Sequence, residues 1–232
     1  QAACMAVAIQ TMHNALVGAG RLKKGESVLI QGASSGVGLL GMQIAKHMGA
    51  SIVMGTSTNE GRRNKLKEFG CDLALDTNDP KWPDKVKEST GGKGVDLIVD
   101  QVSTVMNQNM EAAAILGRIV NVGRLGGMKG EFNYDLHALK RIDYIGVTFR
   151  TRSPEEVRAI VKAARADLWP AIEAGKLQLE HEPILIKDII DHSTSMIAEK
   201  ARVKQLDIQC ELAPTVPTAL MGDGRRIEQI LV

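Results

Sequence analysis

The sequence has 232 residues and a formal net charge of +2, with 44% hydrophobic and 24% charged residues. A charge this close to neutral, together with only 3% aromatic residues, argues against nucleic acid as the main partner, because that role needs a basic surface and stacking rings. No apolar run approaches the ~18 residues that a membrane span requires, so no membrane partner is expected.

The cysteines Cys4, Cys71 and Cys210 are far apart and form no CxxC pair. An odd number of separated cysteines is typical of reduced thiols in the cytosol rather than of a disulfide framework. The histidines are isolated as well, and none stands at metal-ligand spacing from another ligand type. We therefore expect a cytoplasmic protein without a bound metal.

Between residues 25 and 174, short apolar runs alternate with longer amphipathic stretches. The pattern predicts strands over residues 27–31, 51–54, 73–75, 95–100, 118–122 and 143–147, and helices over residues 37–48, 62–69 and 154–174. Further helices are expected before the fourth and fifth strands. Strands without polar alternation are typical of a parallel sheet that helices cover on both faces. The sequence thus predicts an α/β fold, a doubly wound parallel-sheet Rossmann domain.

Residues 183–232 depart from this rhythm. Apolar residues from Ile186 to Ala201 follow helical spacing, residues 205–212 alternate polar and apolar as in a strand, and Asp223 can cap a final helix. We predict two domains: residues 1–182 form the nucleotide-binding domain with a lead-in helix, and residues 183–232 form a short α+β tail of helix, strand and helix.

The segment from Gln31 to Gly38 follows the first strand and opens a helix. Small residues there let the backbone approach a pyrophosphate, and the helix N-terminus supplies free N–H groups. The G-x-G-x-x-G spacing is degraded, because its first two positions hold Ala33 and Ser35. A plain strand–helix turn that binds no nucleotide is the alternative interpretation.

The end of the second strand favours NADPH over NADH. An acidic residue at this point would bind the ribose 2′-hydroxyl of NADH, but no carboxylate occurs before Glu60. Arg62 and Arg63 follow, and a guanidinium suits a 2′-phosphate. The alternative is that both arginines are merely solvated.

Several segments resemble the medium-chain dehydrogenase/reductase superfamily, in its zinc-independent quinone oxidoreductase branch. They are residues 6–16, 25–38, 69–72, 94–100, 116–123 and 149–155. The resemblance implies hydride transfer from NADPH to a quinone or to an activated alkene or carbonyl. It implies no catalytic acid, base or nucleophile, because the cofactor itself transfers the hydride and the protein binds and orients the cofactor. In the zinc-dependent branch a cysteine lies where this sequence has Val7, so no catalytic zinc is expected.

The resemblance also implies the cofactor contacts. The pyrophosphate turn of the family is matched by Ser35, Gly36, Val37 and Gly38, and its adenosine-phosphate contact by Ser57 and Arg62. The adenine–ribose edge is matched by Val102, and the nicotinamide end by Val122, Gly123, Phe149 and Arg150. The family's preceding domain, which supplies much of the substrate pocket, has no counterpart in this sequence. We therefore expect an incomplete catalyst. A non-catalytic binding or dimerisation module is the alternative.

Two further expectations concern association. The edge of the sixth strand, residues 141–149, is a candidate contact for a homodimer, because an unpaired strand edge seeks a partner. Residues 183–190, 198–202 and 217–231 resemble part of a sensor histidine kinase, at the join between its dimerisation helix and its ATP-binding domain. The ATP-binding segments are missing, so the tail is interpreted as a fused, kinase-like fragment without kinase activity.

Overall fold

The computed structural model describes residues 2–177, 182–203, 206–213 and 216–222. The chain divides into two units, one comprising Met5–Gln178 and the other Gln1–Cys4 with Leu179–Val232. Each unit is described by itself.

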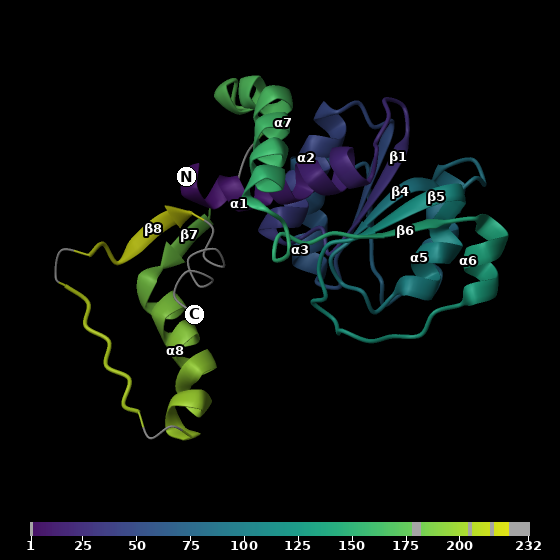
Figure 1. Cartoon of the computed structure of the whole chain (residues 1–232). Helices are drawn as coiled ribbons and strands as arrows, with labels where there is room; N and C mark the ends of the chain where they lie inside the picture. The colour runs from purple at the N-terminus through teal and green to yellow at the C-terminus, as the bar shows by residue number, and fades with distance from the viewer. Residues whose placement is uncertain (1, 178–181, 204–205, 214–215, 223–232) are drawn as a thin grey trace. The chain divides into compact units, whose positions relative to one another are not determined.

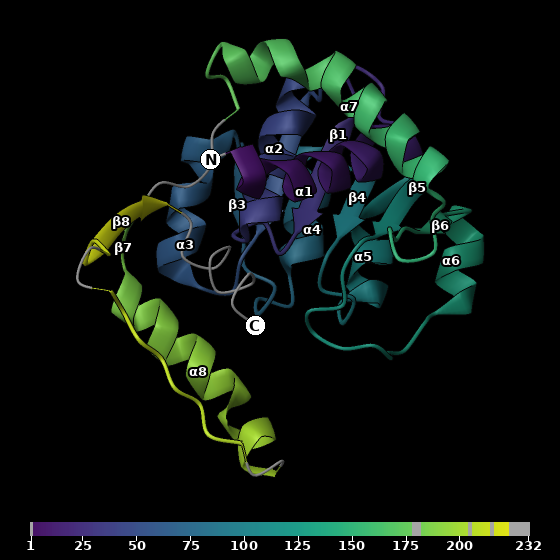
Figure 2. The same cartoon turned by 60° about the vertical axis from the view of Figure 1, so that its left-hand side comes forward.

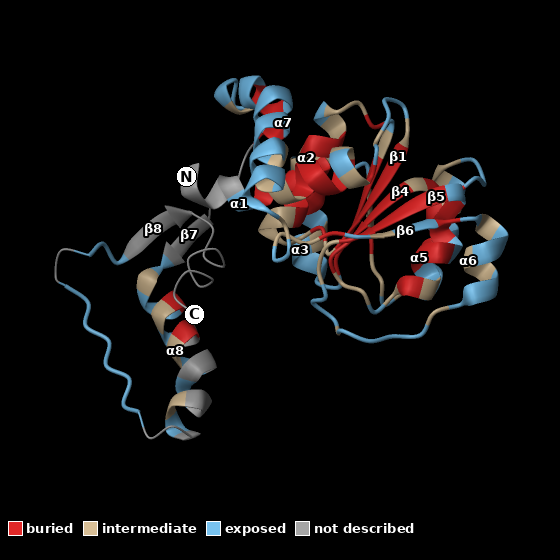
Figure 3. Cartoon of the chain, in the orientation of Figure 1, coloured by how far each residue is buried: buried red, intermediate tan, exposed pale blue. Residues whose placement is uncertain are grey.

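The larger unit contains a six-stranded parallel sheet in the order β3-β2-β1-β4-β5-β6. The strands are β1 (Ser27–Gln31), β2 (Ile52–Thr56), β3 (Leu73–Leu75), β4 (Val95–Asp100), β5 (Ala113–Asn121) and β6 (Asp143–Gly146). The central strands are buried along their length, as the red ribbons of Figure 3 show. The predicted doubly wound sheet is confirmed, and its strand order reverses between β1 and β4.

Helices cover both faces of this sheet (Figure 1). One face carries α4 (Trp82–Ser89), α5 (Met106–Ala112) and α6 (Tyr134–Lys140). The other carries α1 (Ala2–His13), a π-helical turn η1 (Asn14–Ala19), α2 (Gly36–His47), α3 (Glu60–Lys65) with a 3-10 turn η2 (Leu66–Phe69), and α7 (Pro154–Glu173). In the turned view, α1 and α7 lie across the second face (Figure 2).

The local sequence explains where α7 begins and ends. Ser153 and Glu156 form a capping box, in which the Ser153 hydroxyl accepts from the Glu156 N–H and the Glu156 carboxylate accepts from the Ser153 N–H. Pro154 occupies the first helical position, where its missing N–H costs nothing. Gly175, with a φ of +67°, ends the helix. The predicted start at residue 154 is confirmed.

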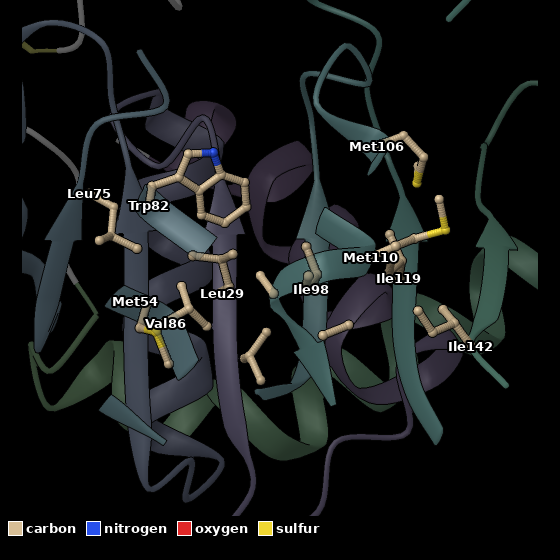
Figure 4. Packing of buried hydrophobic residues seen from close by; sticks show 13 residues of the cluster. Leu29, Met54, Leu75, Trp82, Val86, Ile98, Met106, Met110, Ile119 and Ile142 are labelled. Carbon is tan, nitrogen blue, oxygen red and sulfur yellow. The ribbon is translucent and has the colours of Figure 1, made fainter. Parts of the chain in front are cut away.

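The face that carries α4, α5 and α6 contains a continuous hydrophobic core (Figure 4). Trp82 of α4 is 1% exposed and belongs to the same cluster as Leu29 and Met54 of the sheet. Met110 of α5 and Ile119 of β5 extend the cluster toward β6. On the other face, the Nε2 atom of buried His13 lies 2.7 Å from the Asp167 carboxylate and joins the end of α1 to α7.

β5 differs from its prediction, because it begins at Ala113 rather than at residue 118. Its first half is irregular: the pairing register with β4 shifts between Val95 and Leu97, and Leu116 has a φ of +62°. Ile115 and Leu116 are exposed, so this half lacks the buried apolar run that identified the other strands.

In the smaller unit, β7 (Glu182–Leu185) pairs antiparallel with β8 (Ala219–Gly222), and α8 (Ile186–Val203) follows β7. The helix predicted from Ile186 onward is confirmed. The strand predicted over residues 205–212 is wrong: the described residues 206–213 have no regular structure, since no neighbouring strand pairs with them. The predicted final helix over residues 223–232 lies outside the described residues.

Candidate functional site

The carboxyl ends of β1, β2, β4, β5 and β6 lie at one edge of the sheet, and every predicted site residue follows one of these ends. Since the strand order reverses between β1 and β4, the loops after these two strands diverge to opposite faces. Such a reversal leaves a crevice, which is where open α/β sheets bind their ligands. The structure therefore places the predicted residues along one edge of the sheet, the edge that contains the topological switch point.

The turn after β1 has the geometry of an anion-binding turn. Gly32 has a φ of +70°, and the Ser35 hydroxyl caps α2 by accepting from the Gly38 N–H at 3.0 Å. A Cβ on Gly38 would lie 2.7 Å from the backbone of Ala33, so only glycine allows this approach. The N–H groups of Gly36 and Val37 have no acceptor in the part of the chain that the structure describes. They remain available to a bound anion.

The two arginines of α3, just after β2, differ in their contacts. The Arg63 guanidinium donates to the Ser57 carbonyl at 2.8 Å and to the Asp76 carboxylate at 3.1 Å, so its position is fixed by the protein. Arg62 is exposed, and among the described residues its side chain has no ion-pair partner. The Ser57 hydroxyl is buried and donates to Ser34 at 3.0 Å, which links the end of β2 to the turn after β1. Of these two arginines, Arg62 is the one whose guanidinium is not held by another described residue.

The loops after β4, β5 and β6 lie against one another. Val102 packs beside the turn after β1, with its Cγ2 atom 3.3 Å from where a Cβ on Gly32 would lie. The N–H groups of Val122 and Gly123 both donate to the Asp100 carbonyl, which places them next to Val102.

The segment after β6 continues from the same place, since the Val147 N–H donates to the Asn121 carbonyl. Phe149 is partly buried with the Arg152 guanidinium 5.8 Å from its ring centroid, whereas Arg150 is exposed.

Beneath these loops lies a feature that the sequence analysis missed. The last residues of β2, β1, β4 and β5 are polar, and their side chains form a row, here called the polar row: Thr56, Gln31, Asp100 and Asn121. Each stands two positions after an apolar residue of the core in Figure 4, so the row faces α5. A polar residue at the end of four buried strands was the available signal.

A cavity of about 370 Å³ opens at the same edge, at the β5–β6 end of the polar row. Its walls include Ser103, Asn121, Arg124, Phe132 and Tyr144. The Asn121 amide donates to the Ser103 hydroxyl at 3.0 Å and to the Tyr144 hydroxyl at 2.9 Å. The cavity therefore combines an aromatic wall with polar groups and lies beside Val122 and Gly123.

The described residues form no metal-binding cluster, and the Cys71 thiol is not activated. No three His, Cys, Asp or Glu side chains of the described residues lie close enough to hold a metal ion. Burial raises the pKa of the Cys71 thiol to about 11, so it stays protonated near neutral pH and is a poor nucleophile. Among the described helices, none is both long and apolar enough to cross a membrane.

The profile of the family described as zinc-binding dehydrogenase matches residues 36–165. Human quinone oxidoreductase is 31% identical over 169 residues, which cover 72% of this chain and 50% of that protein. This chain spans about half the length of the curated relatives that it matches.

Two solved structures share the fold. A quinone oxidoreductase from Pseudomonas syringae matches with a TM-score of 0.68 at 24% identity, over 77% of this chain and 55% of that one. A mycobacterial protein solved in complex with NADPH matches with a TM-score of 0.67 at 23% identity, over 76% of this chain and 54% of that one.

Proposed function

Since the chain belongs to the zinc-binding dehydrogenase family, we propose that it is the NADPH-binding domain of a quinone reductase-like oxidoreductase. The observation that carries this proposal is the turn after β1, where Ser35 caps α2 and the Gly36 and Val37 N–H groups lack an acceptor among the described residues. The turn suits a pyrophosphate because the start of α2 presents these N–H groups, and because Gly38 lets the helix approach the backbone of Ala33 closely.

The predicted contacts are divided along the length of the dinucleotide in this proposal. Gly36 and Val37 donate to the pyrophosphate, Arg62 pairs with the 2′-phosphate, and Val102 packs against the adenine ribose. Val122, Gly123, Phe149 and Arg150 flank the nicotinamide. When bound, the cofactor supplies the hydride; the protein orients it and excludes water. The cavity beside Asn121 gives the acceptor, a quinone or an activated alkene or carbonyl, a place near that end.

The direct test is a fluorescence titration with NADPH and NADH, followed by a quinone-reduction assay with the tighter ligand. We expect binding of NADPH and little turnover, since a second domain supplies much of the substrate pocket in the family that this chain resembles. Failure to bind either dinucleotide at millimolar concentration would refute the cofactor proposal. Rapid turnover by the chain alone would refute the expectation of an incomplete catalyst.

Preference for NADPH depends on Arg62 in this proposal. Arg62→Ala removes one charge-assisted contact to the 2′-phosphate, which is worth about 1.5–3 kcal/mol. We expect the Kd for NADPH to rise about 10- to 100-fold and the Kd for NADH to stay the same, as measured by the same titration. Lys65→Ala is the matched control, because Lys65 is an exposed cation on the same helix. An equal loss of both dinucleotides would contradict the phosphate contact.

A homodimer through β6 and a cytoplasmic location complete the proposal. β6 is the last strand of the sheet, and three of its four residues are exposed. Its free edge can therefore pair with a second copy of this chain. Sedimentation equilibrium should give twice the chain mass of 25.0 kDa; a monomer across micromolar concentrations would contradict the dimer. The cytoplasmic location depends on the separated cysteines.

The second candidate function is a non-catalytic association module. The observation that favours it is the irregular segment 206–213, where Leu206, Ile208 and Leu212 are all exposed. Apolar side chains gathered on an exposed segment are typical of a binding surface. The kinase-like resemblance of residues 183–232 remains a prediction. Dinucleotide binding that is unaffected by deletion of this tail, combined with a loss of self-association, would favour the module.

A further inference from the structure

A continuous chain of buried hydrogen bonds connects the two turns that border the crevice. It starts at the Gly32 N–H, which donates to the Thr56 hydroxyl at 3.0 Å, and that hydroxyl donates to the Gln31 side-chain oxygen at 2.7 Å. The Gln31 amide then donates to Asn109 Oδ1 at 2.7 Å, and the Asn109 amide donates to Asp100 Oδ2 at 3.0 Å.

The far end of this chain holds the turn after β4. Asp100 Oδ1 accepts from the N–H of Val102 at 2.7 Å and from the N–H of Ser103 at 3.0 Å. Burial raises the pKa of the Asp100 carboxyl, while these two N–H groups and the Asn109 amide favour its ionised form. An ionised carboxylate can only accept hydrogen bonds, so the three donors around Asp100 fix the direction of the whole hydrogen-bond chain.

Asn109 is the link between the two halves. It is fully buried on α5, and its amide bridges the last side chain of β1 to the last side chain of β4. These are the two strands between which the crevice opens. Loss of the Asn109 amide would leave the buried Gln31 amide nitrogen and the Asp100 Oδ2 atom each without its hydrogen-bond partner, which costs about 1–3 kcal/mol for each unsatisfied group. The role of Asn109 is therefore to make these two hydrogen bonds and not only to fill space.

We propose that Asn109 is a positioning residue for the dinucleotide. From beneath the sheet edge it holds the separation of the turns that follow β1 and β4 without contacting the cofactor, and it does so together with Gln101, whose amide donates to the Gln31 carbonyl at 3.1 Å and whose Oε1 accepts from the Ser35 hydroxyl at 3.1 Å. This inference rests on the proposed function. The Gly36 and Val37 N–H groups can bind a pyrophosphate only where the turn after β1 places them, and Val102 borders the same crevice from the other turn. A change of about 1 Å in their separation lowers binding strongly.

The test compares Asn109→Leu with Met110→Ala, at temperatures where circular dichroism shows both variants to be folded. Asn109→Leu keeps the branched shape of the side chain and breaks the hydrogen-bond chain, whereas Met110→Ala opens the neighbouring hydrophobic core and leaves the hydrogen-bond chain intact. We expect the Kd for NADPH to rise about tenfold or more in Asn109→Leu and to stay within about twofold in Met110→Ala, even where the two variants melt at similar temperatures. Similar effects of both variants on binding, or none in Asn109→Leu, would overturn the inference.

A second measurement separates this inference from the proposed function. Amide hydrogen exchange at Gly32 and Ser103 should accelerate in Asn109→Leu and not in Met110→Ala, whether or not NADPH binds. Wild-type protein that binds no dinucleotide would refute the proposed function, and unchanged exchange would refute the link between the turns. If Asn109→Leu does not fold, Thr56→Val removes the hydroxyl at the other end of the hydrogen-bond chain, and the same two measurements are made on that variant.

Discussion

Gly38→Ala should abolish measurable NADPH binding, with a rise in Kd of about 100-fold or more. The added Cβ would lie 2.7 Å from the Cα and carbonyl oxygen of Ala33 and 2.7 Å from the Gly32 carbonyl oxygen. All three are backbone atoms, so no side chain can move aside. Either α2 must shift away from the turn or the turn must open, and both changes displace the Gly36 and Val37 N–H groups from a bound pyrophosphate.

Gly41→Ala is the matched control for this variant. It adds the same methyl group to the same helix, but the nearest atoms belong to the flexible side chain of Met12, at 3.0–3.2 Å. Alanine also has the higher helix propensity, by about 1 kcal/mol at each site, so both variants gain equally from that term. We expect Gly41→Ala to bind NADPH within about twofold of wild type. Tight binding by Gly38→Ala would contradict the assignment of this turn to the pyrophosphate.

Trp82→Ala should cost about 3–5 kcal/mol of unfolding free energy, the largest stability effect that we expect from one substitution in the larger unit. Trp82 is 1% exposed and packs in the core of Figure 4 between α4 and the sheet. Removing its ring leaves a cavity bordered by strand residues, which cannot collapse without disturbing the sheet. Urea unfolding, followed by far-ultraviolet circular dichroism, measures the loss.

Trp169 provides the comparison, because it is the other tryptophan of the chain. It is 44% exposed on α7, where its indole N–H donates to Glu173 and its ring lies under the Arg165 guanidinium. We expect Trp169→Ala to cost less than about 1 kcal/mol, since exposed contacts of this kind contribute little. Equal losses from the two variants would show that the α4 core is not the stabilising centre of the fold.

The sequence could predict the elements whose evidence is local. The strands over residues 27–31, 73–75 and 95–100 were predicted with their observed bounds, because the first and last are apolar runs and Asp72 and Asp76 flank the middle one. The start of β5 was missed, since the strand is interrupted there by a shift in its pairing with β4 and by the positive φ of Leu116, and neither is visible in the sequence. The strand over residues 205–212 was wrongly predicted, because alternation describes one strand and cannot supply the neighbour with which it must pair.

In the candidate site, too, some features could be predicted from local sequence and others depend on contacts between distant segments. The turn after β1 was found from its position between a strand and a helix, and the roles of Arg62 and Arg63 could be separated only by seeing that Asp76 engages one of them. The polar row depends on the register of four strands, with Gln31 beside Asp100 and Asp100 beside Asn121. That register is set by packing across the whole sheet, so no single segment of sequence contains it. Asn109 joins the row from a helix and was missed for the same reason.

Arg63 is held by other residues of the protein whereas the Arg62 side chain is exposed, and this difference affects which of the two positions can change during evolution. Arg63 holds the loop after β2 in shape, so its replacement carries a structural penalty. Arg62 has no such duty among the described residues, and the Asn59 side chain caps α3 through the Arg62 backbone N–H, which any residue except proline supplies. Position 62 can therefore change without a structural cost among the described residues, and under the proposed phosphate contact such a change would alter dinucleotide preference while the fold stays the same.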